Sequence, residues 1–212
     1  FTPDKGVISD PVCQADYLYQ VYLKDDPDYS GRVTVPVLYD LKQDKIVNNE
    51  SSEIMRMLNS AFDEIGANDL DFYPEELREE IDELNDYVYD RVNNGVYKTG
   101  FATKQEVYEE EVNRLFEALD KLEERLEGQD YLFGDKLTLA DVRLWTTLLR
   151  FDPVYFGHFK CNIRELKEYP NLWRFTRLIY NMPGVEDTVN MDHIKQHYYT
   201  SHDTINPNRI VP

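Results

Sequence analysis

The chain has 212 residues, of which 42% are hydrophobic, and this length and composition allow one large globular domain or two smaller ones. Its formal net charge of −18 argues against nucleic acid or an anionic membrane as a partner, because an acidic surface cannot neutralise phosphates. Most of the acidic side chains fall in residues 75–90 and 106–127, a distribution typical of solvated helix faces. No apolar run is long enough to span a bilayer.

The two cysteines, Cys13 and Cys161, lie far apart and show neither CxxC nor metal-ligand spacing. They form no disulfide framework, so we expect a reducing, cytoplasmic compartment. Both are expected to be packing residues. The first residues, FTPDKGVISDP, contain no initiating Met and no features of a signal peptide. We therefore expect the natural chain to begin upstream of Phe1.

The first 66 residues predict a helix, a β-hairpin and a second helix. Apolar side chains spaced along one helical face predict a helix over residues 14–24, which stops before Pro27. The β-branched run from Val33 to Tyr39 predicts a strand, and Lys45 to Val47 predicts a second strand after a polar turn. Two strands and two helices are too few for an independent domain, as expected for part of a larger α/β sheet.

Within this hairpin, Pro36 predicts an edge position, a bulge or a cis peptide bond. A cis bond would leave the N–H and C=O groups of Val35 free to pair with an extended peptide. Ser51 or Ser52 is expected to cap the following helix, whose N-terminus suits a carboxylate. Residues 32–54 therefore predict either a cradle for a short anionic peptide or a plain hairpin followed by a capped helix.

The remaining residues predict an all-helical domain. One helix is expected from Pro74 to Asn93, with Gly95 as its C-terminal glycine, and another over residues 106–127, ended by Gly128. We expect these two helices to be neighbours in a bundle. The connection over residues 96–103 is too polar and rich in glycine to lie only in a core.

Further along, Thr138 and Asp141 have the spacing of an N-terminal capping box for an apolar helix over residues 142–151. Asp152-Pro153 is expected to break that helix, and Pro170 to start another, which ends near residues 182–184. A last helix is predicted over residues 189–198, followed by an extended tail.

The four histidines, His158, His193, His197 and His202, offer only a weak metal signal. His193 and His197 lie four residues apart on one predicted helix, but no third ligand is evident nearby. We therefore predict no metal site.

Several motifs resemble those of a known enzyme family. The Val-Pro strand, the Asn-Glu-Ser-Ser helix start and the all-helical second part resemble the glutathione transferase fold. Narrower motifs resemble the glutathionyl-hydroquinone reductases, the Xi class of glutathione transferases. These motifs are Ser-Gly-Arg-Val-Thr-Val-Pro-Val (30–37), Val-Asn-Asn-Gly-Val-Tyr-Lys (92–98), Leu-Trp-Thr-Thr (144–147), Arg-Phe-Asp-Pro-Val-Tyr (150–155), His-Tyr-Tyr (197–199) and Thr-Ile-Asn-Pro (204–207). The resemblance covers essentially the whole chain.

The resemblance implies an α+β part followed by an α part. Residues 1–66 would be the C-terminal part of a thioredoxin-like, glutathione-binding domain, and residues 67–212 an all-α domain with an extended tail. The family carries its nucleophile in a Cys-Pro-Trp-Ala-His-Arg type motif, which this sequence does not contain. We expect this cysteine upstream, so that the fragment alone is inactive; a truncated, inactive relative is the alternative.

The resemblance also implies residue roles. Glutathione, as co-substrate, would be bound by Arg32, Val33, Thr34, Val35, Glu50 and Ser51. Tyr97 would be the proton donor or acceptor for the quinol ring, while Tyr155 and Tyr198 would lower the pKa of the catalytic cysteine. The electrophile would lie between the domains, and the protein would be a homodimer.

The function implied by the family is the reduction of glutathionyl-hydroquinones through a cysteine–glutathione mixed disulfide. Two alternatives remain open from the sequence. One is an omega-like thiol transferase or dehydroascorbate reductase on the same fold. The other is a non-catalytic module with the glutathione transferase fold, which would lack the upstream cysteine.

Overall fold

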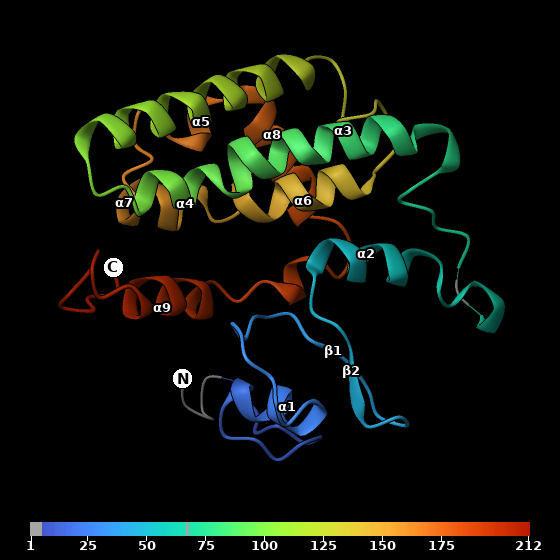
Figure 1. Ribbon diagram of the computed structural model, residues 1–212. Helices are drawn as coiled ribbons and strands as arrows, with labels where there is room; N and C mark the ends of the chain where they lie inside the picture. The colour runs from blue at the N-terminus through green and yellow to red at the C-terminus, as the bar shows by residue number, and fades with distance from the viewer. Residues whose placement is uncertain (1–5, 67) are drawn as a thin grey trace. The chain divides into compact units, whose positions relative to one another are not determined.

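A computed structural model describes residues 6–66 and 68–212 of the chain (Figure 1). The chain divides into two compact units, Phe1–Asp71 and Phe72–Pro212, and each unit is described by itself. Within the described residues, no helix is both long enough and apolar enough to cross a bilayer.

The first unit contains a two-stranded antiparallel sheet and two α-helices. In chain order its elements are α1 (Leu18–Asp25), β1 (Leu38–Asp40), β2 (Lys45–Asn48), α2 (Ser51–Ser60) and a 3₁₀ turn (Asp63–Ile65). Tyr39 pairs with Ile46 across the sheet, and the register shifts between Leu38 and Tyr39. The Asp40 carboxylate closes the hairpin by accepting hydrogen bonds from the N–H groups of the turn at 2.8 and 2.9 Å. The predicted hairpin and its flanking helices are therefore present.

The first strand is shorter than the sequence predicts. The expected strand from Val33 to Tyr39 is wrong in its first half, because β1 begins at Leu38. The peptide bond between Val35 and Pro36 is cis, one of the three geometries that Pro36 predicts. Proline has no N–H to donate to a ladder, and Thr34 bonds to side chains instead of to a neighbouring strand.

The second unit is all-helical, as predicted. Its α-helices are α3 (Arg78–Val88), α4 (Gly95–Gly100), α5 (Gln105–Arg125), α6 (Leu139–Leu148), α7 (Phe156–His158), α8 (Pro170–Tyr180) and α9 (Met191–Ser201). Its π-helical turns are Tyr89–Asn93 and Phe151–Tyr155, and its 3₁₀ turns are Glu75–Leu77, Leu166–Glu168 and Glu186–Thr188. After α9, residues 202–212 form turns and no further helix or strand.

One hydrophobic core holds the second unit together. Helix α5 packs along α4 and α8, and α6 packs against α3 and α8 (Figure 1). Fully buried side chains of this core include Ile81, Leu115, Leu119, Leu144, Phe151, Phe159 and Phe175. Burial of each such side chain stabilises the fold by about 1.5–3 kcal/mol, so this unit has a large core of its own. In the first unit, by contrast, only Tyr22 and Ile54 are buried hydrophobic residues among those described.

The helical path from α3 to α4 corrects the prediction for Gly95. The helix does not end there: the Asn94 N–H donates to the Tyr89 carbonyl at 2.8 Å, a π-type bond, and the Lys98 N–H donates to the Asn94 carbonyl at 2.8 Å. Gly95 is therefore the first residue of α4 and not a C-terminal glycine. The side chain of Asn93 favours the continuation, because it donates to the Thr147 hydroxyl of α6 at 2.7 Å. The expected connection over residues 96–103 is thus mostly helical.

The region around α6 confirms one prediction and corrects another. Thr138 and Asp141 form the predicted capping box. Their bonds are buried: the Thr138 N–H and hydroxyl donate to the Asp141 carboxylate at 2.7 and 2.9 Å. Asp152-Pro153 does not stop the helical path, because Pro153 lies inside the π-turn Phe151–Tyr155. Proline is tolerated in this π-turn because α6 ends at Leu148, so Pro153 lies in a separate helical turn and not inside α6.

Gly100, at the end of α4, provides a test of this packing. A Cβ atom at Gly100 would lie 2.3 Å from Cγ and 2.7 Å from Cβ of the Phe159 side chain. Because Phe159 is fully buried, Gly100→Ala is expected to lower the free energy of unfolding by about 1–3 kcal/mol. Urea denaturation followed by circular dichroism measures the change.

Gly95→Ala is the matched control on the same helix. Its Cβ would meet Leu115 Cδ1 at 3.5 Å, an ordinary contact, and alanine favours a helix over glycine by about 0.5–1 kcal/mol. We expect this variant to be as stable as the wild type or more stable. Equal effects of the two substitutions would contradict the packing of Phe159 on α4.

Candidate active site

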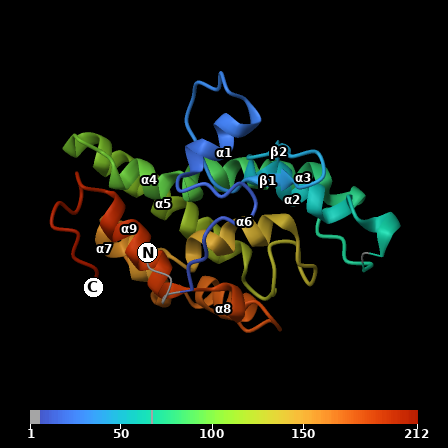
Figure 2. The same cartoon turned by 90° about the horizontal axis from the view of Figure 1, so that it is seen from below.

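Three predicted tyrosines of the second unit form one hydrogen-bonded group, here called the tyrosine trio: Tyr97, Tyr155 and Tyr198. The Tyr198 hydroxyl lies 2.6 Å from the Tyr97 hydroxyl and 2.8 Å from the Tyr155 hydroxyl. Tyr97 comes from α4, Tyr155 from the π-turn and Tyr198 from α9, which packs on that π-turn next to α7 (Figure 2). The structure therefore brings together three residues from widely separated motifs.

The rings of the trio pack against the buried side chain of Phe159. The Phe159 ring stacks on Tyr155 with centroids 5.5 Å apart and planes 11° apart. It also lies 5.3 Å from the Tyr97 ring and 5.9 Å from the Tyr198 ring. Sequence reasoning missed Phe159, since a lone phenylalanine in a loop-like segment carries no sign of this contact. The Phe159 ring contacts all three tyrosine rings and so helps to hold them with their hydroxyl groups close together.

The exposure of the trio sets the direction of its hydrogen bonds. Tyr155 is 3% exposed and Tyr198 is 7% exposed, whereas Tyr97 is 37% exposed. The Tyr198 hydroxyl lies at hydrogen-bond distance from both other hydroxyls, and a side-chain interaction also joins Tyr97 and Tyr155. Either oxygen of each pair can be the donor. Because a buried O–H without an acceptor costs about 1–3 kcal/mol, we infer that the most buried hydroxyl, that of Tyr155, donates to Tyr198 and that Tyr198 donates to Tyr97. The remaining proton is then that of Tyr97, at the accessible end.

Burial favours the protonated form of Tyr97 and of Tyr155. It is the main cause that raises the pKa of Tyr97 and of Tyr155 above the ordinary tyrosine value, and the neighbouring Tyr198 adds to both shifts. Arg150 acts in the opposite direction, because its charge favours a tyrosinate. At neutral pH these hydroxyls are therefore proton donors. Tyr97 can therefore give a proton to a ligand, and the charge of Arg150 favours the anion that remains.

In the first unit, Arg32, Val33, Thr34 and Val35 lie on an exposed loop before β1. Tyr22 of α1 holds this loop: its buried hydroxyl donates to the Thr34 carbonyl at 2.9 Å and accepts from the Thr34 N–H at 3.3 Å. Asn49 donates to the hydroxyls of Thr34 and Tyr22, both at 3.0 Å. The loop is therefore shaped by side chains from α1 and from the start of α2.

This loop presents free polar groups. Val35 is 77% exposed, and within residues 6–66 and 68–212 its N–H and C=O make no hydrogen bond. Tyr29 donates to the Arg32 carbonyl at 2.6 Å, whereas the Arg32 guanidinium has no ion pair or hydrogen bond in the described part of the chain. An extended backbone beside an unpaired cation suits a short peptide with a carboxylate.

Glu50, and not a serine, caps α2. Its carboxylate accepts from the Ser52 N–H at 3.2 Å, and the hydroxyls of Ser52 and Ser51 donate to it at 3.1 and 3.5 Å. The prediction of a serine cap is therefore wrong: the longer Glu50 side chain reaches the same N–H group and carries a full negative charge, which the helix N-terminus favours. Glu50 and Ser51 nonetheless lie together at this helix start.

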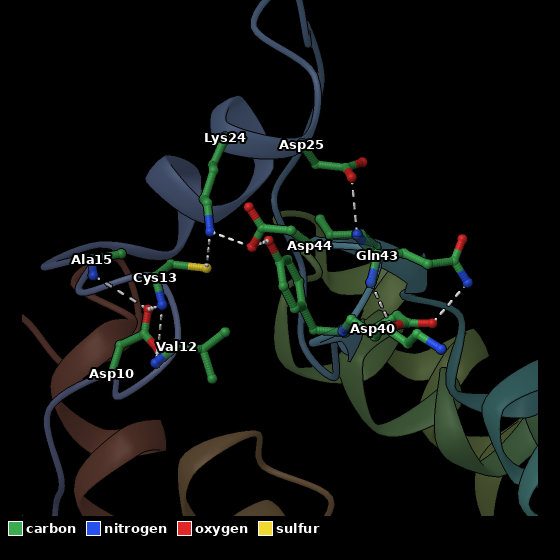
Figure 3. Close-up of polar contacts among 12 residues, drawn as sticks. Asp10, Val12, Cys13, Ala15, Lys24, Asp25, Asp40, Gln43 and Asp44 are labelled. Atoms are coloured by element: carbon green, nitrogen blue, oxygen red, sulfur yellow. Dashed lines mark hydrogen bonds and ion pairs between the residues drawn. The ribbon is translucent and has the colours of Figure 1, made fainter.

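A second polar group in the first unit surrounds Cys13 (Figure 3). The Lys24 ammonium forms an ion pair with Asp44 at 2.6 Å and lies 3.9 Å from the Cys13 sulfur. Asp10 accepts hydrogen bonds from the N–H groups of Val12, Cys13 and Ala15 and thereby shapes the preceding loop. Cys13 is half-buried. The contacts tie the loop before α1 to the hairpin of the same unit.

Cys161 is fully buried in the second unit, and burial raises the pKa of its thiol. A protonated, inaccessible thiol is a poor nucleophile. Its position in the core agrees with the packing role that the sequence predicts.

The histidines do not gather around a metal position. The His158 Nε2 and His202 Nδ1 atoms lie 3.0 Å apart. Burial, together with the charge of His202, lowers the pKa of His158 to about 4. Among the described residues, no three His, Cys, Asp or Glu side chains are placed to hold a metal ion.

The structure thus places the predicted site residues in two groups, one in each unit. The loop residues and the start of α2 lie in the first unit, and the tyrosine trio lies in the second. Sequence reasoning missed Tyr22, Tyr29 and Asn49, which hold the loop. In the sequence, Asn49 is only one member of a polar cluster before a helix. Tyr22 is only one member of an apolar helix face, and Tyr29 lies in a loop.

Tyr198→Phe tests how much the hydrogen bonds of the trio contribute to stability. The substitution removes the hydroxyl that lies 2.8 Å from the buried Tyr155 hydroxyl, so it is expected to lower the free energy of unfolding by about 1–3 kcal/mol. Urea denaturation of this chain measures the loss. Tyr89→Phe is the control, because Tyr89 is half-exposed and its hydroxyl makes no hydrogen bond within residues 6–66 and 68–212. A Tyr198→Phe protein as stable as the control would contradict a stabilising role of these hydrogen bonds.

Comparisons with known proteins agree with these features. Residues 105–177 match the family described as Glutathione S-transferase, C-terminal domain. The chain is 57% identical over 206 residues to the glutathionyl-hydroquinone reductase YqjG of Escherichia coli, covering 97% of this chain and 63% of that protein. It is 54% identical over 212 residues to the glutathionyl-hydroquinone reductase PcpF of Sphingobium chlorophenolicum, covering all of this chain and 68% of that protein.

Solved structures show the same relationship. The glutathione-bound structure of YqjG matches with a TM-score of 0.96 and 57% identity, covering 98% of this chain and 67% of that one. The Xi glutathione transferase of Phanerochaete chrysosporium matches with a TM-score of 0.93 and 57% identity, covering 96% and 70%. The predicted glutathione transferase fold is confirmed, with a partial thioredoxin-like unit that has two strands. The chain spans 63% of the length of YqjG, and it belongs to the glutathionyl-hydroquinone reductases, the Xi class of glutathione transferases.

Proposed function

We propose that the complete protein reduces glutathionylated hydroquinones to hydroquinones, with glutathione as co-substrate. Two relatives that are 54% and 57% identical carry the name of this activity. The observation in this chain that carries the proposal is the tyrosine trio. Its hydrogen bonds of 2.6 and 2.8 Å include the hydroxyl of Tyr97, the most exposed residue of the three.

In the proposed reaction, a cysteine thiolate attacks the sulfur of the glutathionyl group. A sulfur–sulfur bond forms, the bond from sulfur to the ring carbon breaks, and the ring carbon takes the electron pair and a proton. The products are the hydroquinone and a cysteine–glutathione mixed disulfide. A second glutathione thiolate then attacks this disulfide, which releases glutathione disulfide and restores the cysteine thiolate.

Tyr97 is the proposed donor of the ring proton. Its proton is not used within the trio, and its raised pKa keeps the proton in place until the ring accepts it. The tyrosinate that forms would accept the hydrogen bond from Tyr198 and lie under the favourable charge of Arg150. Tyr155 and Tyr198 are proposed to lower the pKa of the cysteine by donating hydrogen bonds to its thiolate, which requires each O–H to exchange its present tyrosine partner for the sulfur.

Arg32, Val33, Thr34, Val35, Glu50 and Ser51 are the proposed glutathione-binding residues. The free N–H and C=O groups of Val35 would pair with the peptide backbone, and the unpaired Arg32 would hold a carboxylate. Glu50 would accept from the ammonium of the γ-glutamyl end and thereby release the hydroxyl of Ser51 and the start of α2 for its carboxylate.

The proposal extends to the protein as a whole. We propose a domain boundary near residue 66, a homodimer and a cytoplasmic location. The nucleophile is assigned to a cysteine outside these 212 residues, because Cys161 is buried and neither cysteine lies in the family motif. The fragment alone would then be inactive.

Activity of the complete protein is the test of the proposed reaction. We expect reduction of a glutathionyl-hydroquinone with release of glutathione disulfide, and Tyr97→Phe is expected to lower kcat/KM by roughly 10²–10⁴-fold, the usual contribution of a proton donor. Tyr89→Phe, on the same helical segment, is the control. A protein that reduces dehydroascorbate and leaves the glutathionyl-hydroquinone unchanged would contradict the proposal.

Binding of an unreactive glutathione analogue tests the role of Arg32. Calorimetry with S-methylglutathione and the complete protein is expected to show that Arg32→Gln raises the dissociation constant by about tenfold or more, because a charge-assisted hydrogen bond contributes about 1.5–3 kcal/mol. Lys42→Gln removes another exposed cation of the same unit and should leave binding unchanged. Equal affinities of the wild type and Arg32→Gln would refute this assignment.

A further inference from the structure

His158 and His202 form a hydrogen-bonded pair, here called the histidine pair, beside the tyrosine trio. The His158 Nε2 and His202 Nδ1 atoms lie 3.0 Å apart, and the two rings stack with their planes 25° apart. His158 is the last residue of α7, and His202 directly follows the last residue of α9. The pair therefore joins the C-terminal end of α9 to α7.

Both rings of the pair are neutral at neutral pH. Burial, the charge of His202 and the charge of Lys160 together lower the pKa of His158 to about 4. Burial and the charge of His197 lower the pKa of His202. A neutral imidazole has one N–H donor and one acceptor nitrogen, so one ring can donate to the other. Because His158 is only 5% exposed, loss of its partner would leave a buried polar nitrogen unpaired, which is unfavourable.

The pair shares its aromatic surroundings with the trio. The Phe159 ring, which contacts all three tyrosine rings, also stacks on His202 with centroids 5.6 Å apart and planes 29° apart. It lies 5.2 Å from the His158 ring. Tyr198 precedes His202 by four residues, about one helical turn, and their ring centroids are 5.9 Å apart. A displacement of His202 would therefore displace Tyr198, both along the helix and through Phe159.

The Thr-Ile-Asn-Pro motif (204–207), to which the proposed reaction gives no role, holds His202 at the end of α9. The N–H groups of Ile205 and Asn206 both donate to the His202 carbonyl at 2.9 Å. The Asn206 side chain donates to the Tyr199 carbonyl at 2.7 Å, within the last turn of α9. These bonds satisfy carbonyl groups at the helix end, and they fix the backbone from which the His202 ring reaches His158.

We propose that the histidine pair positions the trio. Its hydrogen bond fixes the end of α9, so that the Tyr198 hydroxyl stays within reach of the hydroxyls of Tyr97 and Tyr155. In this role neither histidine touches the substrate. The expected effect on reaction rate rests on the proposed function, whereas the expected effect on the trio does not.

Two substitutions of His202 separate its hydrogen bond from its ring. Leucine and asparagine have nearly the same shape, and both lack the imidazole ring. Asparagine alone offers a polar group near the position of Nδ1, with which His158 can bond. His202→Leu therefore removes the hydrogen bond, and His202→Asn can restore it. Ser201→Ala, at an exposed neighbouring position of α9, is the control.

Single-turnover release of hydroquinone by the complete protein tests the effect on rate. We expect His202→Leu to slow release about 10-fold to 100-fold, because a small misplacement of a catalytic group has effects of this size. The substrate concentration at half-maximal rate should not change, since the pair makes no contact with the substrate. His202→Asn and Ser201→Ala should release hydroquinone nearly as fast as the wild type.

Urea denaturation of the same protein tests the effect on the trio and needs no reaction. Tyr198→Phe is introduced into the wild type, into His202→Leu and into His202→Asn. The hydrogen bonds of the trio are weakened in advance when α9 is no longer fixed, so Tyr198→Phe should destabilise His202→Leu less than it destabilises the wild type. In His202→Asn, Tyr198→Phe should have its full effect.

Three results would overturn the proposal. They are wild-type release by His202→Leu, equal slowing by His202→Leu and His202→Asn, and an equal effect of Tyr198→Phe on the stability of the wild type and of His202→Leu. A wild-type protein that releases no hydroquinone would contradict the proposed function instead, and the stability measurements would still decide the role of the histidine pair.

Discussion

The hydrogen bond between Tyr155 and Tyr198 is the constraint on which the proposed chemistry of the helical unit depends. Tyr155 is almost fully buried, and its hydroxyl lies 2.8 Å from that of Tyr198. An unpaired hydroxyl at this depth would cost about 1–3 kcal/mol. The bond therefore helps to hold α9 against the π-turn that carries Tyr155. With the direction of bonding that we infer, Tyr198 keeps one proton to donate, and the Tyr97 hydroxyl lies 2.6 Å away to accept it.

Two π-turns place the members of the trio. Tyr97 follows the turn Tyr89–Asn93, and Tyr155 is the last residue of the turn Phe151–Tyr155. A π-turn adds one residue to a helical repeat and so rotates the side chains that follow. Asn93 anchors the first turn on α6 through Arg143 and Thr147. Wide helical turns are frequent at functional sites, and here both lie next to the residues to which we assign the proton chemistry.

Features with a local cause could be predicted from the sequence. The capping box of Thr138 and Asp141 needs only two side chains and their own backbone, and Pro36 restricts its own peptide bond.

Features decided by distant contacts could not be predicted from the sequence. Gly95 has the sequence of a helix end, but Asn93 bonds to α6 and the helical path continues. Val33 belongs to a strand-like run, but the loop is held by Tyr22 and Asn49. Glu50 caps α2 in place of the expected serines, because its side chain is longer and carries a full negative charge.

In the proposed reaction, Tyr97 gives a proton in the first half-reaction. It gives none in the second, which is exchange between a thiol and a disulfide. Single-turnover kinetics of the complete Tyr97→Phe protein, with the half-reactions measured separately, tests this assignment most directly. We predict that release of hydroquinone slows by roughly 10²–10⁴-fold, while glutathione resolves the mixed disulfide at the wild-type rate. Equal slowing of both half-reactions, or wild-type release of hydroquinone, would contradict the account.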